Sequence, residues 1–367
     1  MRGLFALMVL MFATPAFAEV VPMDSPRWER IGEGVRIEDY QGKHAMYLEH
    51  SGAVLNDANF DTGVIEFDMV FPTAARGFPG IYFRGVDGSN YENFYFRPQW
   101  NGRPDATQYT PVFNDHTSWQ IYSGPTYMGE TTFPIGTWFH VKIEVAADSA
   151  RFYINSDQPT LVIHDLKRDE AAGYIALTGG AGTYYANFNI TRGPQADAGS
   201  EPAFDLPDGL VRRWMVSDSM PEEAAMSAAA ANHFANDTVL PVETNGILNI
   251  GRLGSLTETN TTVLAHFKLH ADRARAALMR FAFSDRVHIY LNGTLLYEGD
   301  DTQNSRDYRF LGIVGFWSSL NLQLRRGDND ITFVVYEGQG GAAVGGGGWA
   351  ASAAFPEMNG LSLDPRH

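Results

Sequence analysis

Two carboxylates that stand two residues apart, Glu66 and Asp68, have the spacing best suited to acid–base chemistry in this chain. Side chains at positions i and i+2 of a β-strand lie on the same face, and a retaining glycosidase uses two carboxyl groups about 5–5.5 Å apart. Further along the strand, Val70 and Phe71 are apolar. An amphipathic strand with a solvated acidic face has the same spacing, and we predict that Glu66 and Asp68 lie on such a face.

A second pattern, Asp57-x-Asn59-x-Asp61, carries the oxygen ligands that calcium prefers. The sixth position of the loop is Thr62 instead of the glycine that an EF-hand requires, and a strand pattern follows in place of a helix. An EF-hand is therefore excluded. We predict no cofactor, and a structural calcium ion in this loop is an alternative that the sequence leaves open without predicting it.

Two histidines, His266 and His270, belong to another run of alternating residues. Four residues of a strand span about 13 Å, and zinc–nitrogen bonds of about 2 Å cannot bridge that distance. The chain also has no Cys, which excludes thiolate metal sites and disulfides. We therefore predict no metal site here, and we expect the two histidines to lie on a solvated polar face.

The segment from residue 82 to residue 122 combines aromatic rings with planar hydrogen-bonding groups. Alternation within the run 93–97 places Phe94 and Phe96 on one face and Asn93, Tyr95 and Arg97 on the other. Ligand sites combine an apolar wall with a few placed polar groups, and this mixture suits the C–H faces and hydroxyls of sugars. The predicted ligand-binding residues are Arg84, Asn93, Tyr95, Arg97, Tyr109 and Trp119. In the alternative interpretation the aromatic rings pack a second sheet and Arg97 pairs with a structural carboxylate.

The elements that must position these residues are strands. Short alternating runs such as 64–71 and 139–145, separated by Gly, Pro, Asn and Asp, are typical of antiparallel β structure. One helix is expected, over 220–231, where Pro221 opens an Ala-rich run. Many short strands at this spacing predict an all-β chain with two β-sandwich domains of jelly-roll type.

The domain limits follow from breaks in this pattern. Residues 191–209 lack periodicity and are rich in Pro, Gly and Ala. We predict a first domain over 19–193, a linker over 194–209 and a second domain over 210–367. Seven glycines lie between Gly338 and Gly348; without a Lys-Ser/Thr pair after them they indicate a flexible loop between strands, not a phosphate-binding loop.

The first 18 residues have the pattern of a cleavable secretory signal. Met1-Arg2 precedes an apolar run over 4–12, and Ala16-Phe17-Ala18 supplies the small residues that signal peptidase requires. We predict export to the periplasm or the extracellular space, with cleavage after Ala18. No later segment has the roughly 20 apolar residues of a bilayer span, so no membrane span is predicted.

The overall charge of the chain excludes some classes of binding partner. The 367 residues include 43 acidic and 27 basic side chains, which gives a formal net charge of -16. A surface built to hold nucleic-acid phosphates or anionic lipid would be basic. We therefore predict no nucleic-acid partner, and a carbohydrate or other polymer as the ligand.

The first half resembles the concanavalin A-like lectin/glucanase superfamily, in its laminin-G-like and 3-keto-disaccharide-hydrolase-like branches. The resemblance covers roughly residues 30–192. The segments that carry it are 60–68 (FDTGVIEFD), 80–84 (GIYFR), 91–98 (YENFYFRP), 108–114 (QYTPVFN) and 138–142 (WFHVK). It implies a jelly-roll sandwich, and its functions include sugar binding, hydrolysis and adhesion. The strand-borne Glu-x-Asp motif of its family 16 glucanases is incomplete here.

The second half resembles the galactose-binding-like β-sandwiches that accompany glycosidases. The segments 283–293 (FSDRVHIYLNG) and 324–331 (LRRGDNDI) carry this second resemblance. Together the two resemblances imply a carbohydrate-active chain, with the second sandwich as an accessory module.

Three hypotheses of function follow from the sequence. The first is an exported, non-catalytic protein that binds carbohydrate or another extracellular polymer through the first domain. The second is a glycoside hydrolase acting on keto-disaccharide-like substrates, for which Glu92, Asp115 and His116 are the only candidates near the predicted site. The third is a structural or adhesive surface protein.

Overall fold

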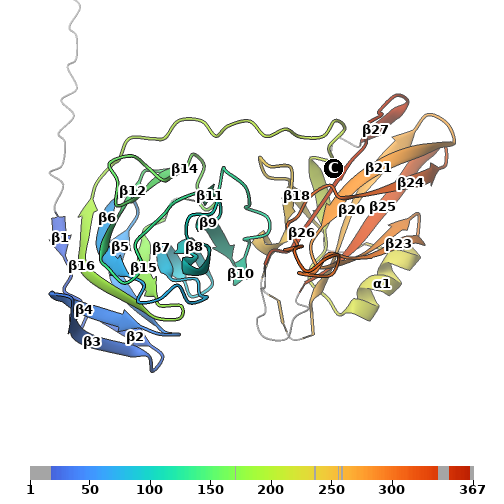
Figure 1. Ribbon diagram of the computed structural model, residues 1–367. Helices are drawn as coiled ribbons and strands as arrows, with labels where there is room; N and C mark the ends of the chain where they lie inside the picture. Colours follow the sequence, from blue (N-terminus) through green and yellow to red (C-terminus); the bar gives the residue numbers. More distant parts are fainter. Residues whose placement is uncertain are drawn as a thin grey trace, which may run out of the picture.

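Figure 1 shows the computed structural model, which describes residues 18–169, 171–234, 237–254, 256–257, 259–337 and 347–363. The predicted signal peptide, except for Ala18, and residues 338–346 of the glycine-rich segment lie outside the described residues. The described chain forms four antiparallel sheets in two sandwiches. The predicted all-β class with two sandwiches is therefore confirmed.

The first sandwich consists of two sheets that face each other. The order of strands in sheet 1 is β14 (Leu161–Ile163), β13 (Ala150–Ile154), β12 (Phe139–Val145), β6 (Gly63–Val70), β16 (Thr183–Arg192), β4 (Lys43–Leu48) and β3 (Val35–Tyr40), with β1 (Ala18–Val20) also paired to β16. The order in sheet 2 is β10 (His116–Thr117), β9 (Thr107–Phe113), β8 (Asn90–Phe96), β7 (Gly80–Asp87), β15 (Gly173–Thr178), β5 (Gly52–Phe60) and β2 (Trp28–Ile31), with β11 (Met128–Gly129) also paired to β9. A short 3-10 helix, η1 (Pro98–Trp100), follows β8.

The second sandwich also has two sheets. The order in sheet 3 is β18 (Thr238–Pro241), β17 (Arg213–Val216), β20 (Thr262–Ala271), β25 (Gly327–Tyr336), β22 (Arg286–Leu291) and β23 (Thr294–Asp300), with β27 (Leu361–Leu363) also paired to β20. The order in sheet 4 is β19 (Leu248–Asn249), β26 (Ala350–Ala354), β21 (Arg275–Phe283) and β24 (Ser318–Leu324). A second 3-10 helix, η2 (Ile250–Arg252), follows β19.

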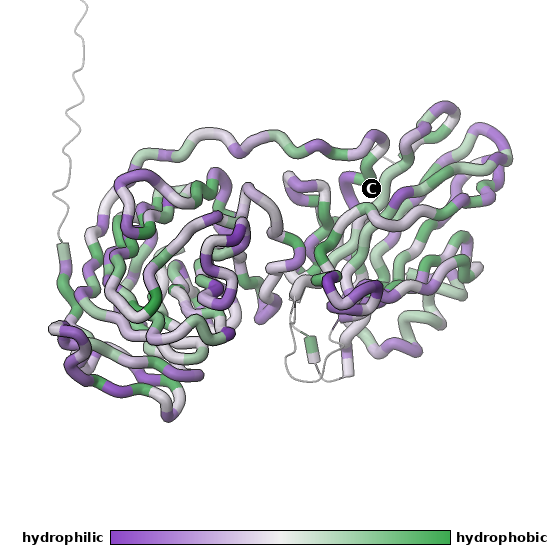
Figure 2. The backbone as a smooth tube through the Cα atoms, viewed as in Figure 1, coloured by the Kyte–Doolittle hydropathy of each residue, from purple (hydrophilic) through white to green (hydrophobic). Residues whose placement is uncertain are grey.

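Alternating apolar residues form the core, as the period of two predicts. In β6 the inward side chains Ile65, Phe67 and Met69 are fully buried, while Glu66 and Asp68 between them are partly exposed. Figure 2 shows the same pattern over the chain, with hydrophobic residues along the strands and hydrophilic residues gathered at turns. Burial of apolar area of this kind supplies most of the stability of a domain this size.

The predicted helix is present as α1 (Glu222–Ala231), which begins directly after Pro221 and ends at Asn232 in the left-handed conformation. It packs on β20, β25 and β22 of sheet 3. The described residues contain no helix that is both long enough and apolar enough to cross a membrane.

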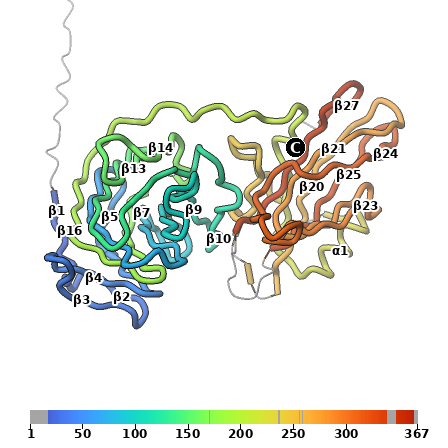
Figure 3. The backbone as a smooth tube through the Cα atoms, viewed as in Figure 1, coloured from blue at the N-terminus to red at the C-terminus, as the bar shows by residue number. Residues whose placement is uncertain are grey.

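A long connection joins the two sandwiches. Residues 193–212, all of them described, contain no helix or strand and run along one side of both sandwiches. The linker and domain limits inferred from the sequence stay predictions. Figure 3 shows that the chain also brings the two sandwiches together directly, near β10.

The contact between the sandwiches is both apolar and polar. Ile247, Val314 and Ala350 of the second half belong to the same core cluster as the first sandwich. Across the same boundary the Tyr122 hydroxyl donates to Glu243 at 2.5 Å, and Arg252 donates to the carbonyl of Lys167 at 2.8 Å. The two halves therefore share one desolvated interface.

Lys167 is the most deeply buried charge at this interface. Its side chain is 3% exposed, and its ammonium group contacts Asp165 at 2.6 Å, Glu201 at 3.0 Å and the Thr244 hydroxyl at 3.1 Å. The last contact crosses between the halves. An ion pair at such a site is costly to break because the remaining charge stays buried.

Replacing Lys167 should therefore destabilise the whole chain. We expect Lys167→Met to lower the free energy of unfolding by about 3–5 kcal/mol, because the Glu201 carboxylate would lose its countercharge. Urea unfolding measures this change. The matched control is Lys142→Met, at a partly exposed pair with Glu144, for which we expect less than about 1 kcal/mol. Equal effects of the two substitutions would contradict the role given to Lys167.

Candidate functional site

The outer face of sheet 2 carries a wide hollow. Because the inner face packs on sheet 1, side chains of opposite parity point outward. The strand register aligns one outward residue from each strand in a row across the sheet. This row is Glu29 (β2), Val54 (β5), Ala176 (β15), Tyr82 (β7) and Asn93 (β8).

Small residues in the middle of the sheet produce the hollow. Gly52 and Thr178 lie beside Val54 and Ala176 on the same face, so no long side chain fills the space above them. The resulting groove has a volume of about 730 Å³ and lies over β2, β5, β15, β7 and β8. Four strand spacings of about 4.8 Å give it a length of roughly 19 Å across the sheet.

Three tyrosines form a wall at the β7–β8 side of the groove. The rings of Tyr82 and Tyr91 are stacked, with centroids 4.1 Å apart and planes 24° apart, and Tyr174 lies 6.4 Å from Tyr91. All three line the groove and are partly exposed. Burial raises the pKa of each of these phenols above its usual value, so they stay neutral at physiological pH. We call this set the tyrosine wall.

Polar groups complete the lining. The carboxylate of Glu29 accepts a hydrogen bond from the Asn56 amide. The carboxylate of Asp87 accepts from Ser89 N at 2.8 Å and from the Asn90 amide at 3.0 Å. His50 lies at the edge of the groove as well. The site thus has an aromatic wall, two carboxylates and an imidazole.

A bulge in β7 sets the position of the tyrosine wall. Between Phe83 and Asp87 the register with β8 shifts, and Arg84 adopts the left-handed conformation with φ of 52°. The following residue, Gly85, lies directly under the Tyr174 ring, where a Cβ would come within 2.2 Å of ring carbons. The Tyr174 hydroxyl donates to the carbonyl of Asp87 at 3.1 Å. The ring is therefore held against a position that only glycine can occupy.

Arg84, predicted to bind ligand, points inward from this bulge. Its side chain is 1% exposed, and the guanidinium donates to the carbonyls of Asp61 at 2.7 Å, Ala147 at 2.9 Å and Ala146 at 2.6 Å. These carbonyls belong to the turns after β5 and β12. The structure thus gives Arg84 structural partners, and a ligand role for it stays a prediction.

Tyr109 also lies on the inner face, opposite Phe94 in the register of β8 and β9. It is fully buried, donates from its hydroxyl to Glu92 at 2.7 Å, and accepts from Lys167 N at 2.9 Å. It does not line the groove.

Tyr95, Arg97 and Trp119 come together at the other end of the outer face, as the sequence predicted for Tyr95 and Arg97. The Arg97 guanidinium bonds to the Tyr95 hydroxyl at 2.8 Å and to Gln108, whose amide donates to the carbonyl of Trp119 at 3.0 Å. Tyr95 and Arg97 are 6% and 3% exposed; Phe78 packs edge-on against the Tyr95 ring, and the Arg97 guanidinium lies over the Trp100 ring. Arg97 bonds to a phenol, an amide and a carbonyl, not to the carboxylate of the alternative interpretation.

Asn93 is the predicted residue closest to the groove. It lies directly opposite Tyr82 in the β7–β8 register. Its side-chain oxygen is buried and has no hydrogen-bond partner among the described residues. None of the six predicted residues lines the groove itself, and their role in binding stays a prediction.

The sequence analysis missed the tyrosine wall, although a signal was present. Tyr82 alternates with Ile81 and Phe83, and Tyr91 has the same parity as Asn93, which was predicted to lie on the ligand-binding face. Applying the same period of two to 80–92 would have included both tyrosines. Tyr174 comes from a distant strand, and only the pairing of β15 with β7 places it there.

The residues on which the hydrolase hypothesis depends lie apart from the groove. Glu92 is fully buried on the inner side, with Tyr109 and Arg168 N as its partners. Asp115 accepts from the Ser89 hydroxyl at 3.0 Å, and His116 is 1% exposed. None of the three lines the groove.

His116 lies instead at the boundary between the sandwiches. Its ring is 5.5 Å from Trp349, and its Nδ1 is 4.0 Å from a carboxylate oxygen of the buried Glu337. Burial lowers the pKa of His116. Burial, and then the charge of Asp285, raises the pKa of Glu337 well above its usual value. Burial therefore favours the neutral form of both side chains in this interface.

Glu66 and Asp68 lie on the outer face of sheet 1, as predicted. Asp68 contacts Lys43 at 2.6 Å and His140 at 2.9 Å, and His140 also lies 3.4 Å from Glu66. They form a surface charge network.

The side chains in the two sequence patterns that were considered as metal sites contact other protein groups. Asp57 of the calcium-like loop pairs with Arg27 at 2.8 Å, and the described residues contain no group of three or more side chains placed to hold a metal ion. The polar face expected for the two histidines is wrong for His266, which is 4% exposed. The residues after α1 cover it: Phe234 stacks on its ring at 3.9 Å and Asp237 bonds to it at 2.9 Å.

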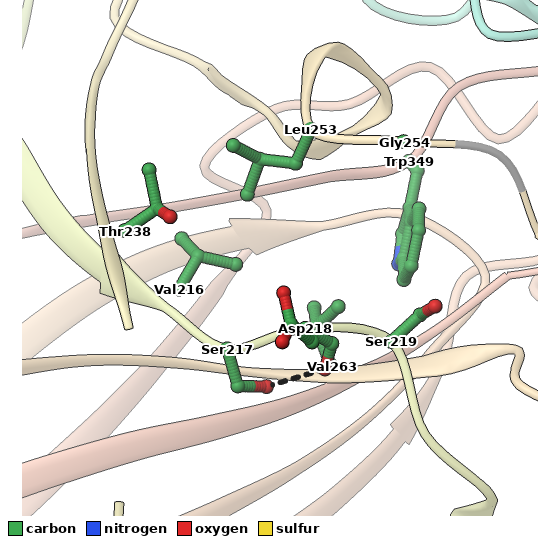
Figure 4. Close-up of a pocket in the computed structure, with 9 residues that line it drawn as sticks. All are labelled: Val216, Ser217, Asp218, Ser219, Thr238, Leu253, Gly254, Val263 and Trp349. Carbon is green, nitrogen blue, oxygen red and sulfur yellow. Dashed lines mark hydrogen bonds between the residues drawn. The ribbon is translucent and has the colours of Figure 1, made fainter. Parts of the chain in front are cut away.

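The second sandwich has a smaller hollow of about 300 Å³, shown in Figure 4. Trp349, Leu253 and Val216 give it apolar sides, and Asp218 and Ser219 add polar groups. The Ser217 hydroxyl donates to the carbonyl of Asp218 at 2.9 Å and accepts from Leu264 N, so its hydrogen-bonding capacity is used within the protein.

Comparisons with known proteins concern the first half of the chain. No protein-family model matches this sequence, and no curated protein matches it. Among solved structures, a protein of unknown function with a galectin-like fold from Bacillus subtilis matches at 13% identity and a TM-score of 0.36, covering 50% of this chain and 99% of that one. The carbohydrate-binding module CBM66 from Bacillus subtilis matches at 14% identity and a TM-score of 0.34, covering 46% and 97%.

The β-glucanase of Bacillus licheniformis matches at 11% identity and a TM-score of 0.36, covering 49% of this chain and 99% of that one. At identities of 11–14% and TM-scores of 0.34–0.36, the superfamily of the first half stays a prediction. Likeness at this level says nothing about the ligand of this chain. The galactose-binding-like resemblance of the second half stays a prediction.

Because of its hydrogen bonds, Arg84 should contribute to the stability of the protein. We expect Arg84→Met to lower the free energy of unfolding by about 3 kcal/mol or more, because the carbonyls of Asp61, Ala146 and Ala147 lose charged donors. Urea unfolding measures it, with Arg30→Met at an exposed position of β2 as the control. A ligand contact without a structural role would give the opposite result, with unchanged stability and lower affinity.

The buried carboxyl group of Glu92 should make the stability of the protein depend on pH. Burial raises its pKa to about 7, although Tyr109, Arg168 and Arg84 act in the opposite direction. The unfolded carboxyl ionises near 4.5, so the folded state holds the proton more tightly, and this contribution to stability is lost as pH rises from about 4.5 to 7.

Glu92→Gln removes that loss. Relative to the unmodified protein, we expect its free energy of unfolding to increase by up to about 3 kcal/mol between pH 4.5 and pH 8. Urea unfolding across this range is the measurement, with the exposed Glu357→Gln as the control. Parallel pH profiles for Glu92→Gln and the unmodified protein would show that Glu92 is not protonated in the folded state.

Proposed function

We propose that this protein binds carbohydrate chains, without catalysis, in the groove on the outer face of sheet 2. The observation that carries the proposal is the tyrosine wall of Tyr82, Tyr91 and Tyr174 beside a floor of small residues. Aromatic faces pack against the C–H faces of sugar rings, and nearby amides and carboxylates accept or donate hydrogen bonds to their hydroxyls.

The dimensions of the groove support a chain as the ligand. It crosses five neighbouring strands and is open along its length, which suits several linked sugar units better than one enclosed unit. Asn93, with an unpartnered buried oxygen beside Tyr82, is the residue of the predicted set best placed to support such a ligand.

The position of the carboxylates supports binding without hydrolysis. Glu29 lies on β2 and Asp87 on β7, which are three strands apart in sheet 2. Three spacings amount to about 14 Å, whereas glycosidase carboxyl pairs are about 5–5.5 Å apart when retaining and about 6.5–9.5 Å when inverting. The two carboxylates in the groove are too far apart to share one glycosidic bond. We further propose that the chain acts outside the cytoplasm, on the evidence of its N-terminal sequence.

The tyrosine wall gives the direct test. We expect Tyr82→Ala, Tyr91→Ala and Tyr174→Ala each to weaken polysaccharide binding about 5- to 10-fold, the loss of roughly 1–1.4 kcal/mol of ring contact. Affinity electrophoresis against soluble β-glucans, xylans, mannans and dextran identifies a polymer, and calorimetry then measures the affinities.

The matched control is Tyr308→Ala, because Tyr308 is 80% exposed and lies in the second sandwich. We expect no change for this variant. Retardation of the intact protein by none of the polymers, or equal affinity of the wall variants and the control, would overturn the proposed function.

A further inference from the structure

The charges that face the groove are of one sign. Of the described residues that line it, Glu29 and Asp87 are acidic, His50 has an imidazole, and none is Lys or Arg. Both carboxylates are exposed to solvent. A ligand in the groove therefore lies in a negative potential.

Three basic side chains of neighbouring segments do not line the groove. Arg27 is held by Glu19 and Asp57. Arg30 alternates with Glu29 along β2 and points to the opposite face. Arg168 donates to Asn90 and to the carbonyl of Val112.

From this distribution we infer that the groove selects chains of neutral or amino-bearing sugars and rejects chains that carry carboxylate or sulfate groups. The inference rests on the proposed function and names the class of ligand for the same site. An acidic sugar would place its anion near Glu29 or Asp87 without a basic partner, and like charges brought together at an interface lower affinity strongly. The net charge of -16 adds a repulsion for polyanions before contact.

The carboxylates also offer a favourable contact to a different group. A protonated amine on a sugar can donate up to three hydrogen bonds, and both Glu29 and Asp87 present carboxylate oxygens to the groove. Charge-assisted hydrogen bonds are about twice as strong as neutral ones. Amino groups on the chain should therefore raise affinity where acidic groups lower it.

The test uses polymers that share a backbone and differ in charge. Dextran, carboxymethyl-dextran and diethylaminoethyl-dextran form one series; hydroxyethyl-cellulose, carboxymethyl-cellulose and chitosan form a second with β-1,4 linkage. In the series whose neutral member binds, we expect the carboxymethyl polymer to bind at least tenfold more weakly at low salt. This ratio should shrink at 0.5 M salt, since screening shortens the range of the repulsion.

Paired variants assign the selection to the groove. We expect Glu29→Gln/Asp87→Asn to reduce the neutral-to-acidic ratio several-fold. The control Asp218→Asn/Glu357→Gln changes the net charge by the same amount in the second sandwich, and it should leave the ratio nearly unchanged. The amino-bearing polymer should lose affinity with the groove variant and not with the control.

The outcomes separate this inference from the proposed function. Equal affinity for neutral and carboxymethyl polymers, or equal effects of the groove variant and its control, would overturn the charge selection while the binding function stands. Failure of every polymer to bind would overturn both.

Discussion

The guanidinium group of Arg84 joins the two sheets of the first sandwich, and the candidate site depends on this connection. Arg84 occupies a bulge in β7 and donates to three carbonyls in turns that flank the strands of sheet 1. These bonds hold an arginine in a left-handed backbone conformation that is uncommon for residues with a side chain. On the other side of the sheet the same bulge presents Gly85 as the flat surface under Tyr174. A buried interaction thus fixes an exposed ring.

The groove exists because sheet 2 has small residues in the middle of its outer face, while its inner face is filled. Its inner face is filled by large side chains such as Phe83 and Phe94. Its outer face has Gly52, Val54 and Ala176 where a fully packed sheet would have larger residues. A sheet with one packed and one solvated face is normal for antiparallel strands, and here the solvated face is hollow between a tyrosine wall and an edge strand. Shape and charge then act together on the ligand.

The second sandwich contributes to the first through their shared interface. Residues of both halves contact Lys167, Tyr122 and Gln120. Gln108, which bonds to Tyr95 and Arg97, also donates to the carbonyl of Trp119 next to Gln120. The polar cluster around Arg97 is thus connected to the interface between the halves.

The sequence by itself determined the class of fold and the direction of most strand side chains, because a period of two needs no knowledge of partners. Alternation in 64–71, 93–97 and 139–145 assigned inner and outer faces correctly, and Pro221 marked the start of the one expected helix. Tertiary structure decided what covers each face. The same alternation that placed Tyr95 and Arg97 outward could not show that both side chains are buried. A sequence also does not state which distant strands pair, so Tyr174, Glu29 and the small residues of β5 joined Tyr82 only when sheet 2 assembled. The inward direction of the Arg84 side chain could not be predicted from the sequence for the same reason. Its bulge and its three acceptors come from segments far apart in the chain.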